Sequence, residues 1–276
     1  MNWLKRTWSR FTEPPPIDID EALWQATVAR YPFLAALGND ETARLQTLCG
    51  QFIRQKQFVG AGGLVLTDEI VLAISAQACL PVLNLALDLY GNWQGIVVYQ
   101  GEVVARREVA DELGVIHVYD EPLSGEAMPG GPVVLSWEDV QGFETAADAQ
   151  ADAAFPAYNV VIHEFAHKLD MLKGEANGLP PWDARFHSDT PLPDWSTLWR
   201  SALDQALDDF TQRVAAAKTE AEEEALPLDP YATENPAEFF AVASEAFFVS
   251  PARLQNAYPE LYRLFVRFYR QDPLTR

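Results

Sequence analysis

Apolar residues recur at helical spacing in the first third of the chain. One stripe consists of Trp24, Val28, Tyr31 and Leu34, and a second consists of Leu45, Leu48, Phe52 and Phe58. Because residues three or four positions apart share one face of an α-helix, the stripes predict two helices between residues 20 and 57. A third helix is expected from residue 68 to residue 79, before Pro81 interrupts the pattern.

The pattern changes to short β-rich runs between residues 95 and 137. Runs rich in β-branched and aromatic residues, separated by Gly, Asp and Pro, lie at 96–99, 103–104, 115–119 and 133–137. Helical spacing returns at about 156–173, with Pro156 in the first turn, and then at 195–221, 235–249 and 254–269. Grouped strands followed by grouped helices predict an α+β fold, mostly helical with a small mixed sheet, rather than alternating βαβ units.

The composition adds a strong acidic bias to an ordinary globular profile. The 276 residues are 49% hydrophobic, and 40 acidic residues against 20 basic ones leave a formal net charge of −20. Such a surface disfavours direct nucleic-acid binding and would attract a basic protein partner, although a role in solubility alone also accounts for it. No run has the continuity of a signal peptide or membrane span, so a cytoplasmic location is expected. Cys49 and Cys79 lack a paired ligand spacing and are expected to be buried, small side chains.

One short motif has metal-binding chemistry. His163-Glu164-Phe165-Ala166-His167 reads H-E-x-x-H, and on a helix the two imidazoles lie one turn apart on the same side, where they can bind one zinc ion. Glu164 is then placed to act as a general base on water at the metal. The helix is supported by an apolar stripe on a different face, formed by Val161, Phe165, Leu169 and Leu172. The alternative is a core helix that carries two incidental histidines.

A catalytic zinc ion needs a third protein ligand and an open position for water. Glu238 is the preferred candidate, because Asn235 can cap a helix that Pro236 opens, and a glutamate in the first turn can point at the metal. Glu245, two turns further on, could orient a ligand or be a surface carboxylate. Tyr231, seven residues before Glu238, could donate a hydrogen bond to the oxyanion that develops during amide attack.

Other residues are weaker candidates as metal ligands. Glu234 is an alternative third ligand, but it precedes the helix. Asp170 would crowd the histidines if it bound the metal, so we expect it to support a ligand from behind or to stabilise the helix. Lys173 occupies the position of the third metzincin ligand and excludes that class. His117, in a predicted strand, and His187, in a Pro-rich loop, are expected to be structural.

The two motifs together resemble the Mlc titration factor A family of zinc peptidases. The resemblance lies in residues 163–170 and 235–245, extends over roughly residues 24–273, and has supporting segments at 131–137, 177–178, 258–262 and 272–273. The spacing from Tyr231 to Glu238 is also similar to that in the catalytic domain of anthrax lethal factor. One departure is Ala232, where a glycine is expected after the tyrosine.

The resemblance implies a zincin-like fold of the gluzincin type and a cytosolic peptidase reported to act as an aminopeptidase. It implies that one Zn²⁺ ion is held by His163, His167 and Glu238. It further implies that Glu164 is the general base and that Tyr231 stabilises the transition state. The family also binds and inactivates Mlc, a repressor of the glucose phosphotransferase system.

These observations lead to a predicted organisation and activity. Residues 1–16 are expected to form an N-terminal arm, and residues 17–276 a single zincin-like catalytic unit, helical over 17–93, with the sheet and active-site helices in 94–276. The predicted activity is peptide hydrolysis by a zinc-activated water, with the Mlc repressor as a further partner. An edge strand near residues 133–137 is expected to pair with an extended peptide. The alternatives are a non-catalytic, zinc-stabilised protein that sequesters a transcriptional repressor, and a hydrolase that acts on non-peptide amides.

Overall fold

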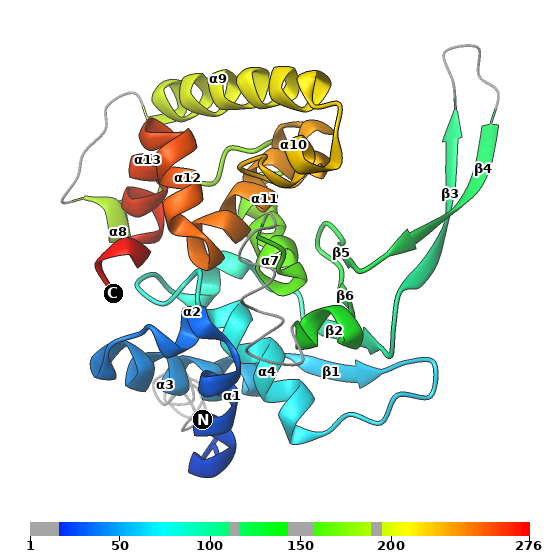
Figure 1. The fold of residues 1–276 in the computed structure, drawn as a ribbon. Helices are drawn as coiled ribbons and strands as arrows, with labels where there is room; N and C mark the ends of the chain where they lie inside the picture. The colour runs from blue at the N-terminus through cyan, green and yellow to red at the C-terminus, as the bar shows by residue number, and fades with distance from the viewer. Residues whose placement is uncertain (1–16, 111–115, 143–156, 189–194) are drawn as a thin grey trace, which may run out of the picture.

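A computed structural model describes residues 17–110, 116–142, 157–188 and 195–276. The predicted N-terminal arm and Pro156 lie outside these residues, as does the His117 side chain. A small sheet lies beside a larger set of helices, and helix α7 runs between them (Figure 1). Among the residues described, no helix is long and apolar enough to cross a membrane.

The main sheet is mixed and has four strands in the order β1–β2–β6–β5. β1, β2 and β6 are parallel, whereas β5 pairs with β6 in the antiparallel direction. The strands span Gln57–Gly60 (β1), Gly95–Tyr99 (β2), Gly125–Ala127 (β5) and Val133–Ser136 (β6). Alternate apolar side chains point into the core, because successive residues of a strand face opposite sides of the sheet. The fully buried apolar ones are Ile96, Val98, Val133 and Leu135.

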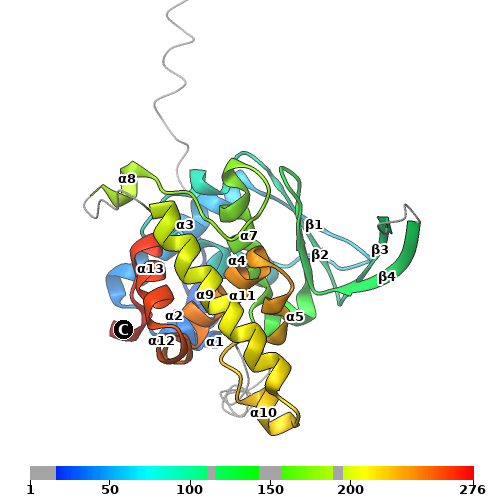
Figure 2. The same cartoon turned by 90° about the horizontal axis from the view of Figure 1, so that it is seen from above.

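A second, two-stranded antiparallel sheet consists of β3 (Val103–Ala110) and β4 (Ile116–Leu123). This ribbon projects away from the helices in both Figure 1 and Figure 2. Among the residues described, the helices therefore pack mainly against the four-stranded sheet rather than against this ribbon.

Helices make up most of the described chain. The N-terminal helices are α1 (Glu21–Arg30), α2 (Pro32–Ala35), α3 (Asn39–Gln55) and α4 (Asp68–Cys79). The later helices are α5 (Trp137–Gln141), α7 (Val160–Asp170), α8 (Ala184–His187), α9 (Trp195–Ala216), α10 (Glu220–Glu224), α11 (Pro236–Val249), α12 (Pro251–Ala257) and α13 (Pro259–Tyr269). Short 3-10 helices lie at Leu87–Tyr90, Met171–Lys173, Pro230–Thr233 and Pro273–Thr275.

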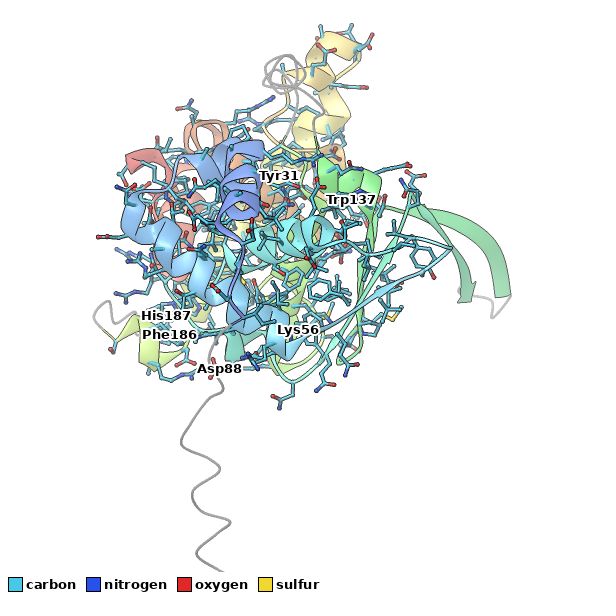
Figure 3. All side chains as sticks on the ribbon, turned by 90° about the horizontal axis from the view of Figure 1, so that it is seen from below. Tyr31, Lys56, Asp88, Trp137, Phe186 and His187 are labelled. Atoms are coloured by element: carbon cyan, nitrogen blue, oxygen red, sulfur yellow. The ribbon has the colours of Figure 1, made fainter. Side chains whose placement is uncertain are left out.

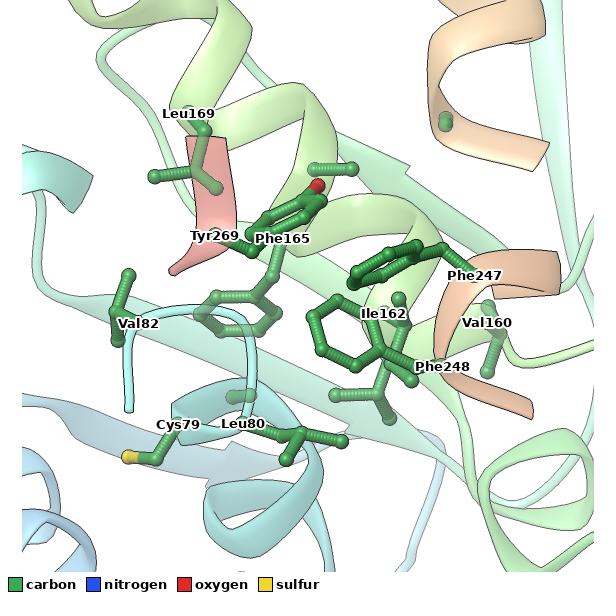
Figure 4. Packing of buried hydrophobic residues seen from close by; sticks show 14 of the residues in the cluster. Cys79, Leu80, Val82, Val160, Ile162, Phe165, Leu169, Phe247, Phe248 and Tyr269 are labelled. Carbon is green, nitrogen blue, oxygen red and sulfur yellow. The ribbon is translucent and has the colours of Figure 1, made fainter. Parts of the chain in front are cut away.

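The core is built around α7, which packs against α11 on one side and against α4 and β5 on others. Phe165 on this helix is fully buried, and its ring lies 5.6 Å from that of Phe52, 4.9 Å from Tyr90 and 5.7 Å from Trp93. Figure 4 shows further apolar side chains of α7 facing residues of α4 and α11. This packing fixes the orientation of α7, and therefore of the polar residues on its other face.

The N-terminal helices are joined to α5 through a polar contact at the edge of the core. The Tyr31 hydroxyl donates a hydrogen bond of 3.0 Å to the Val140 carbonyl oxygen. The Arg30 guanidinium lies 5.9 Å from the rings of both Tyr31 and Trp137, and Figure 3 shows these two aromatic residues near one another. The contact links the first helices to the segment that follows β6.

The mostly helical α+β prediction is confirmed, but one βαβ unit is present that the sequence pattern did not predict. Phe58, assigned to the second helical stripe, lies instead in β1. Helix α4 connects β1 to the parallel strand β2, as a parallel pair requires a crossover connection. Phe58 follows Phe52 by six residues, which would place it on a different helical face, so the apolar stripe of α3 already ends at Phe52.

The predicted edge strand is wrong. Strand β6 lies between β2 and β5, so it has hydrogen-bonded neighbours on both sides. Strands β1 and β5 form the two edges of the sheet, and the three residues of β5 are too few to give a recognisable β pattern in the sequence.

The helix boundaries differ from the expected ones where caps and prolines intervene. The motif helix begins at Val160, later than expected, because Asn159 is its N-cap. The predicted helix over 254–269 is divided at Pro259, whose ring nitrogen cannot donate a backbone hydrogen bond. The helix that begins at Trp195 ends at Ala216.

Candidate metal centre

Helix α7 presents the two histidines of the H-E-x-x-H motif. The Asn159 side chain accepts a hydrogen bond of 2.9 Å from the Ile162 backbone N–H and so stabilises the first turn. One turn separates His163 from His167, and the centres of their rings are 4.8 Å apart. The helix therefore brings both imidazoles to one site, as the motif predicts.

Helix α11 brings a carboxylate to the same place. The Asn235 side chain caps this helix and accepts hydrogen bonds from the backbone N–H groups of Ala237 (2.9 Å) and Glu238 (3.1 Å). Glu238 lies in the first turn, and α11 packs directly against α7. The capped first turn thus directs Glu238 towards the two histidines, where the sequence placed it.

Three ligand atoms form a nearly equilateral triangle. Glu238 Oε2 lies 3.0 Å from His163 Nε2 and 3.1 Å from His167 Nε2, and the two Nε2 atoms are 3.2 Å apart. Atoms at about 2.0–2.1 Å from a tetrahedral zinc ion would be roughly 3.3 Å from one another, close to the observed spacing. The two imidazole nitrogens face each other, which is compatible with a cation bound between them. Among the residues described, His163, His167 and Glu238 form the group that could hold a metal ion.

The charges at the triangle favour an ionised carboxylate. Burial acts to raise the pKa of Glu238, but the hydrogen bonds to His163 and His167 outweigh it and lower this pKa to about 2. Burial likewise opposes protonation of His163, yet hydrogen bonds to Glu238 and Glu245 raise its pKa well above the usual value. The ionised Glu238 carboxylate would therefore attract a cation bound between these groups.

Glu245 lies behind His163 and is a buried residue, not the surface carboxylate considered as an alternative. It is 2% exposed, and its Oε1 atom lies 2.8 Å from His163 Nδ1. It also accepts a hydrogen bond from the backbone N–H of Asn159, the cap of α7. Burial raises the pKa of Glu245. This carboxyl therefore holds the His163 ring in the orientation that turns Nε2 towards Glu238 and His167.

Glu164 lies beside the triangle and is 5% exposed. Burial raises the pKa of its carboxyl group. A cleft of about 580 Å³ opens at this position and is lined in part by Glu164, Tyr231 and all three residues of β5. A smaller hollow of about 210 Å³ adjoins it and shares Gly125, His163, Glu164 and Tyr231. A substrate in the cleft would thus be within reach of both Glu164 and the edge strand.

Tyr231 lies at the rim of the cleft, in the 3-10 helix that precedes α11. Its ring centre is 6.1 Å from that of His163, and the residue is 49% exposed. The Asp229 side chain fixes this turn by accepting a hydrogen bond of 2.8 Å from the Tyr231 backbone N–H. The spacing between Tyr231 and Glu238 therefore places a phenol beside the histidines.

Asp170 is not part of the triangle. Its Oδ2 atom accepts hydrogen bonds from the backbone N–H groups of Asn177 (2.7 Å) and Gly178 (2.6 Å), and the residue is 4% exposed. Burial raises its pKa. Asp170 Oδ1 and His167 Nδ1 are both buried without a hydrogen-bond partner, one turn apart on α7. Asp170 thus anchors the segment after α7, and its expected support of a metal ligand stays a prediction.

The remaining candidates lie away from the triangle. Glu234 is exposed at the end of the 3-10 helix. His187 belongs to the short helix α8, is fully buried, and is hydrogen-bonded to the Phe268 carbonyl oxygen and the Asp183 backbone N–H. Cys49 and Cys79 are buried free thiols, as expected.

Sequence reasoning missed a second group of residues near the centre. Lys168, next to His167, is 2% exposed and donates hydrogen bonds to the carbonyl oxygens of Met128 (2.6 Å) and Gly131 (2.9 Å), in the turn between β5 and β6. Its ammonium group also lies 4.5 Å from the ring centre of Trp93. The sequence feature that could have revealed this role is the position of Lys168 beside the apolar stripe of α7, because a charged residue that is buried there needs a partner.

Comparisons with known proteins agree with this centre. The model of the family described as glucose-regulated metallo-peptidase M90 matches residues 3–270. Mlc titration factor A of Pectobacterium atrosepticum is 36% identical over 255 residues, which covers 92% of this chain and 87% of that protein. The protein of the same name from Serratia proteamaculans is 37% identical over 257 residues, 92% of this chain and 89% of that protein. Mlc titration factor A of Yersinia pestis is 34% identical over 247 residues, which covers 89% of this chain and 83% of that protein.

The matched segment contains the motif helix, the 3-10 helix with Tyr231 and the capped turn with Glu238. The resemblance inferred from the two motifs is thus confirmed over nearly the whole chain, together with a His-His-Glu cluster that suits a metal ion. The chain belongs to the glucose-regulated metallo-peptidase M90 family.

Proposed function

We propose that the chain is a zinc-dependent peptidase in which Glu164 is the general base and Tyr231 stabilises the transition state. The observation that carries this proposal is the triangle of three ligand atoms with the Glu164 carboxyl buried beside it. Structural zinc sites are closed by four protein ligands, whereas catalytic sites have three and keep one position for water. A carboxyl group and a phenol next to the metal can take part in catalysis, whereas a structural zinc site needs neither.

The ligands in this proposal are His163, His167 and Glu238. When bound, zinc supplies Lewis acidity and lowers the pKa of water to about 7. Glu238, with its pKa lowered to about 2, is ionised at neutral pH, as a metal ligand must be. Two imidazoles and one carboxylate also suit other divalent transition metals, so the metal has to be identified by analysis.

Proton transfer is assigned to Glu164. The ionised carboxylate takes a proton from the attacking water as the oxygen of that water bonds to the carbonyl carbon. Once protonated, Glu164 passes the proton to the leaving nitrogen as the C–N bond breaks. Burial raises the pKa of Glu164, the direction that suits a group that accepts a proton and later donates it. The Tyr231 hydroxyl donates a hydrogen bond to the oxyanion that develops on the carbonyl.

The substrate in this proposal is an extended peptide. Strand β5 is an edge strand of the sheet and lines the cleft, so we expect a peptide to lie along it and to pair through backbone hydrogen bonds. The cleft volume of about 580 Å³ lies within the usual range of ligand sites, roughly 300–1,000 Å³. Preference for a free N-terminus, as in an aminopeptidase, follows from the family resemblance.

A second function is binding of the Mlc repressor. The relatives named above are called Mlc titration factor A, and we extend binding of Mlc to the present chain. The formal net charge of −20 would speed association with a basic partner at low ionic strength. Such a partner would place the protein in the cytoplasm. In the alternative, a zinc-stabilised binding protein, the chain binds the Mlc repressor but does not hydrolyse peptides.

The substitution Glu164→Gln tests the proposal. It keeps the size of the side chain but removes the base, so hydrolysis should fall by roughly 100- to 10,000-fold while zinc content and Mlc binding are unchanged. Peptides with free and acetylated N-termini should be compared, because loss of cleavage on acetylation would support an aminopeptidase. Glu234→Gln, at an exposed position, is the control. Undiminished hydrolysis by Glu164→Gln would refute the base, whereas Mlc binding without any hydrolysis by the wild type would favour the binding protein.

A further inference from the structure

We propose that Gly125 is a positioning residue for hydrolysis, because its missing side chain leaves the space that the Glu164 carboxyl group occupies. The inference rests on the proposed function, in which Glu164 is the general base. It concerns the contact between the edge strand β5 and helix α7, which borders both hollows of the centre.

The backbone of Gly125 does not itself require glycine. Its φ angle lies outside the left-handed region, and the residue pairs regularly with Leu135 in the β5–β6 ladder. Glycine weakens a strand and is typical of places where another part of the molecule approaches closely. The reason for glycine at this position must therefore lie in its neighbours.

Those neighbours are side chains of α7. A Cβ atom on residue 125 would lie 2.6 Å from Glu164 Oε1, 2.8 Å from Glu164 Cγ and 2.7 Å from Val160 Cγ2. All three distances are below 3.0 Å, a separation that Cβ atoms do not tolerate. Two of the three atoms belong to the general base, so even the smallest side chain would compete with it for space.

The open space next to these two side chains is the hollow of about 210 Å³ that both of them line. Glu164 is 5% exposed, and Val160 is 3% exposed in the first turn of α7. A methyl group at residue 125 must therefore turn the Glu164 carboxyl away or move β5 away from α7. Either response changes the alignment of the base with a peptide on β5, and a misplacement of about 1 Å can reduce the rate roughly 100-fold.

Gly101 provides a matched control. A Cβ atom there would also approach a glutamate carboxylate, lying 2.8 Å from Glu138 Oε2. Glu138 is exposed at the start of α5, so its flexible side chain can move aside. The same glycine-to-alanine change thus produces the same type of contact without touching the metal centre.

The first experiment compares Gly125→Ala and Gly101→Ala in the zinc-loaded protein. We expect Gly125→Ala to keep its zinc content and to lose at least tenfold in kcat, with a shifted acid limb of the kcat/KM profile, while Gly101→Ala matches the wild type. Unchanged kcat and pH profile in Gly125→Ala would overturn the proposal. Restoration of kcat by adding Val160→Ala would also overturn it, because the obstruction would then lie at Val160.

The second experiment measures thermal stability and needs no activity. Glu164→Ala removes both glutamate atoms near residue 125, so Gly125→Ala should lower the melting temperature less in that background than in the wild type. Equal losses in both backgrounds, or failure to fold in both, would place the obstruction elsewhere and refute the contact. An inactive wild type with the expected coupling would refute the peptidase function alone, whereas an active wild type without coupling would refute the role of Gly125.

Discussion

Glu245 illustrates what a single buried carboxyl group contributes to the metal centre. It contacts His163 on the ring nitrogen opposite to the one that faces Glu238, and it also binds the backbone that begins α7. Partners of this kind fix the ring orientation and the tautomer of a metal-binding histidine. One side chain of α11 thus contacts both the start of α7 and a histidine of the triangle on the same helix.

We expect Glu245→Gln to weaken zinc binding by roughly 10- to 100-fold, because the amide cannot supply the negative charge that supports the His163 ring. The affinity can be measured by competition with a coloured chelator. Glu234→Gln, which changes an exposed glutamate outside the triangle, should leave it unchanged. Equal affinities of Glu245→Gln and the wild type would contradict the supporting role of Glu245.

We expect Lys56 to make stability depend on pH. It is 8% exposed, its ammonium group donates a hydrogen bond of 2.7 Å to the Trp93 carbonyl oxygen, and burial lowers its pKa from 10.5 to about 8. Between pH 8 and 10.5 the unfolded chain therefore binds this proton more strongly than the folded protein does. The free energy of unfolding should rise with pH in this window, by roughly 3 kcal/mol at most.

The substitution Lys56→Met should reduce this rise, since it removes one of two lysines, with Lys168, whose pKa burial lowers to about 8. Urea unfolding at pH 7.5, 9 and 10.5 measures the slope, and Lys173→Met, at an exposed lysine, is the control. The same slope in Lys56→Met and in the wild type would show that Lys56 is not the source.

At the scale of elements, the relation between α7 and β5 determines how a peptide would meet the metal centre. Gly125 allows the strand to approach the helix, and Lys168 of α7 binds the turn after the strand through two carbonyl oxygens. The ammonium groups of Lys168 and Lys56 both lie over the Trp93 ring, at 4.5 and 3.7 Å from its centre. A short edge strand is thus held by side chains and not by a long ladder of backbone bonds.

Replacing this lysine in Lys168→Met should loosen the β5–β6 turn. Two charge-assisted hydrogen bonds are lost, each of the kind that contributes roughly 1.5–3 kcal/mol. Hydrogen exchange should become faster at residues 125–131 while α11 keeps its protection, and KM for peptides should increase. Lys173→Met is again the control, and unchanged exchange at the turn would argue against this role of Lys168.

The elements differ in how far the sequence could predict them. Helix α4 has the expected bounds, because Thr67 caps it and its apolar residues have clear helical spacing. Strand β1 was missed, because Phe58 was counted with the preceding helical stripe although it follows Phe52 by six residues. Strand β5 was missed because three residues carry no periodicity. Local caps and long repeats are visible in a sequence, whereas short strands depend on the partner with which they pair.

For the molecule as a whole, the centre joins parts of the chain that are far apart. Glu238 follows His163 by 75 positions and His167 by 71, and the two helices meet through an apolar interface. In the unfolded chain these ligands would be dispersed. A metal ion that binds all three should therefore stabilise the folded state.

We expect removal of the metal by a chelator to lower the melting temperature by several degrees, and added zinc to restore it. At a zinc concentration of 100 times Kd, the stabilisation would be about 2.7 kcal/mol. Differential scanning calorimetry measures the change. Glu238→Ala should show a much smaller response to zinc, and a wild type that melts at the same temperature with and without zinc would count against a metal at the triangle.

The sequence by itself determined the family, the helical pairing of His163 and His167, and the capped turn that carries Glu238. These features depend on residues close together in the chain, where helix geometry and capping translate spacing directly into position. Only the tertiary structure decided that Glu245 is buried behind His163, that β5 and not β6 is an edge strand, and that residue 125 lies against Glu164. Each of these depends on the distance between separate elements, which is set by packing of the core and is not encoded in any local pattern.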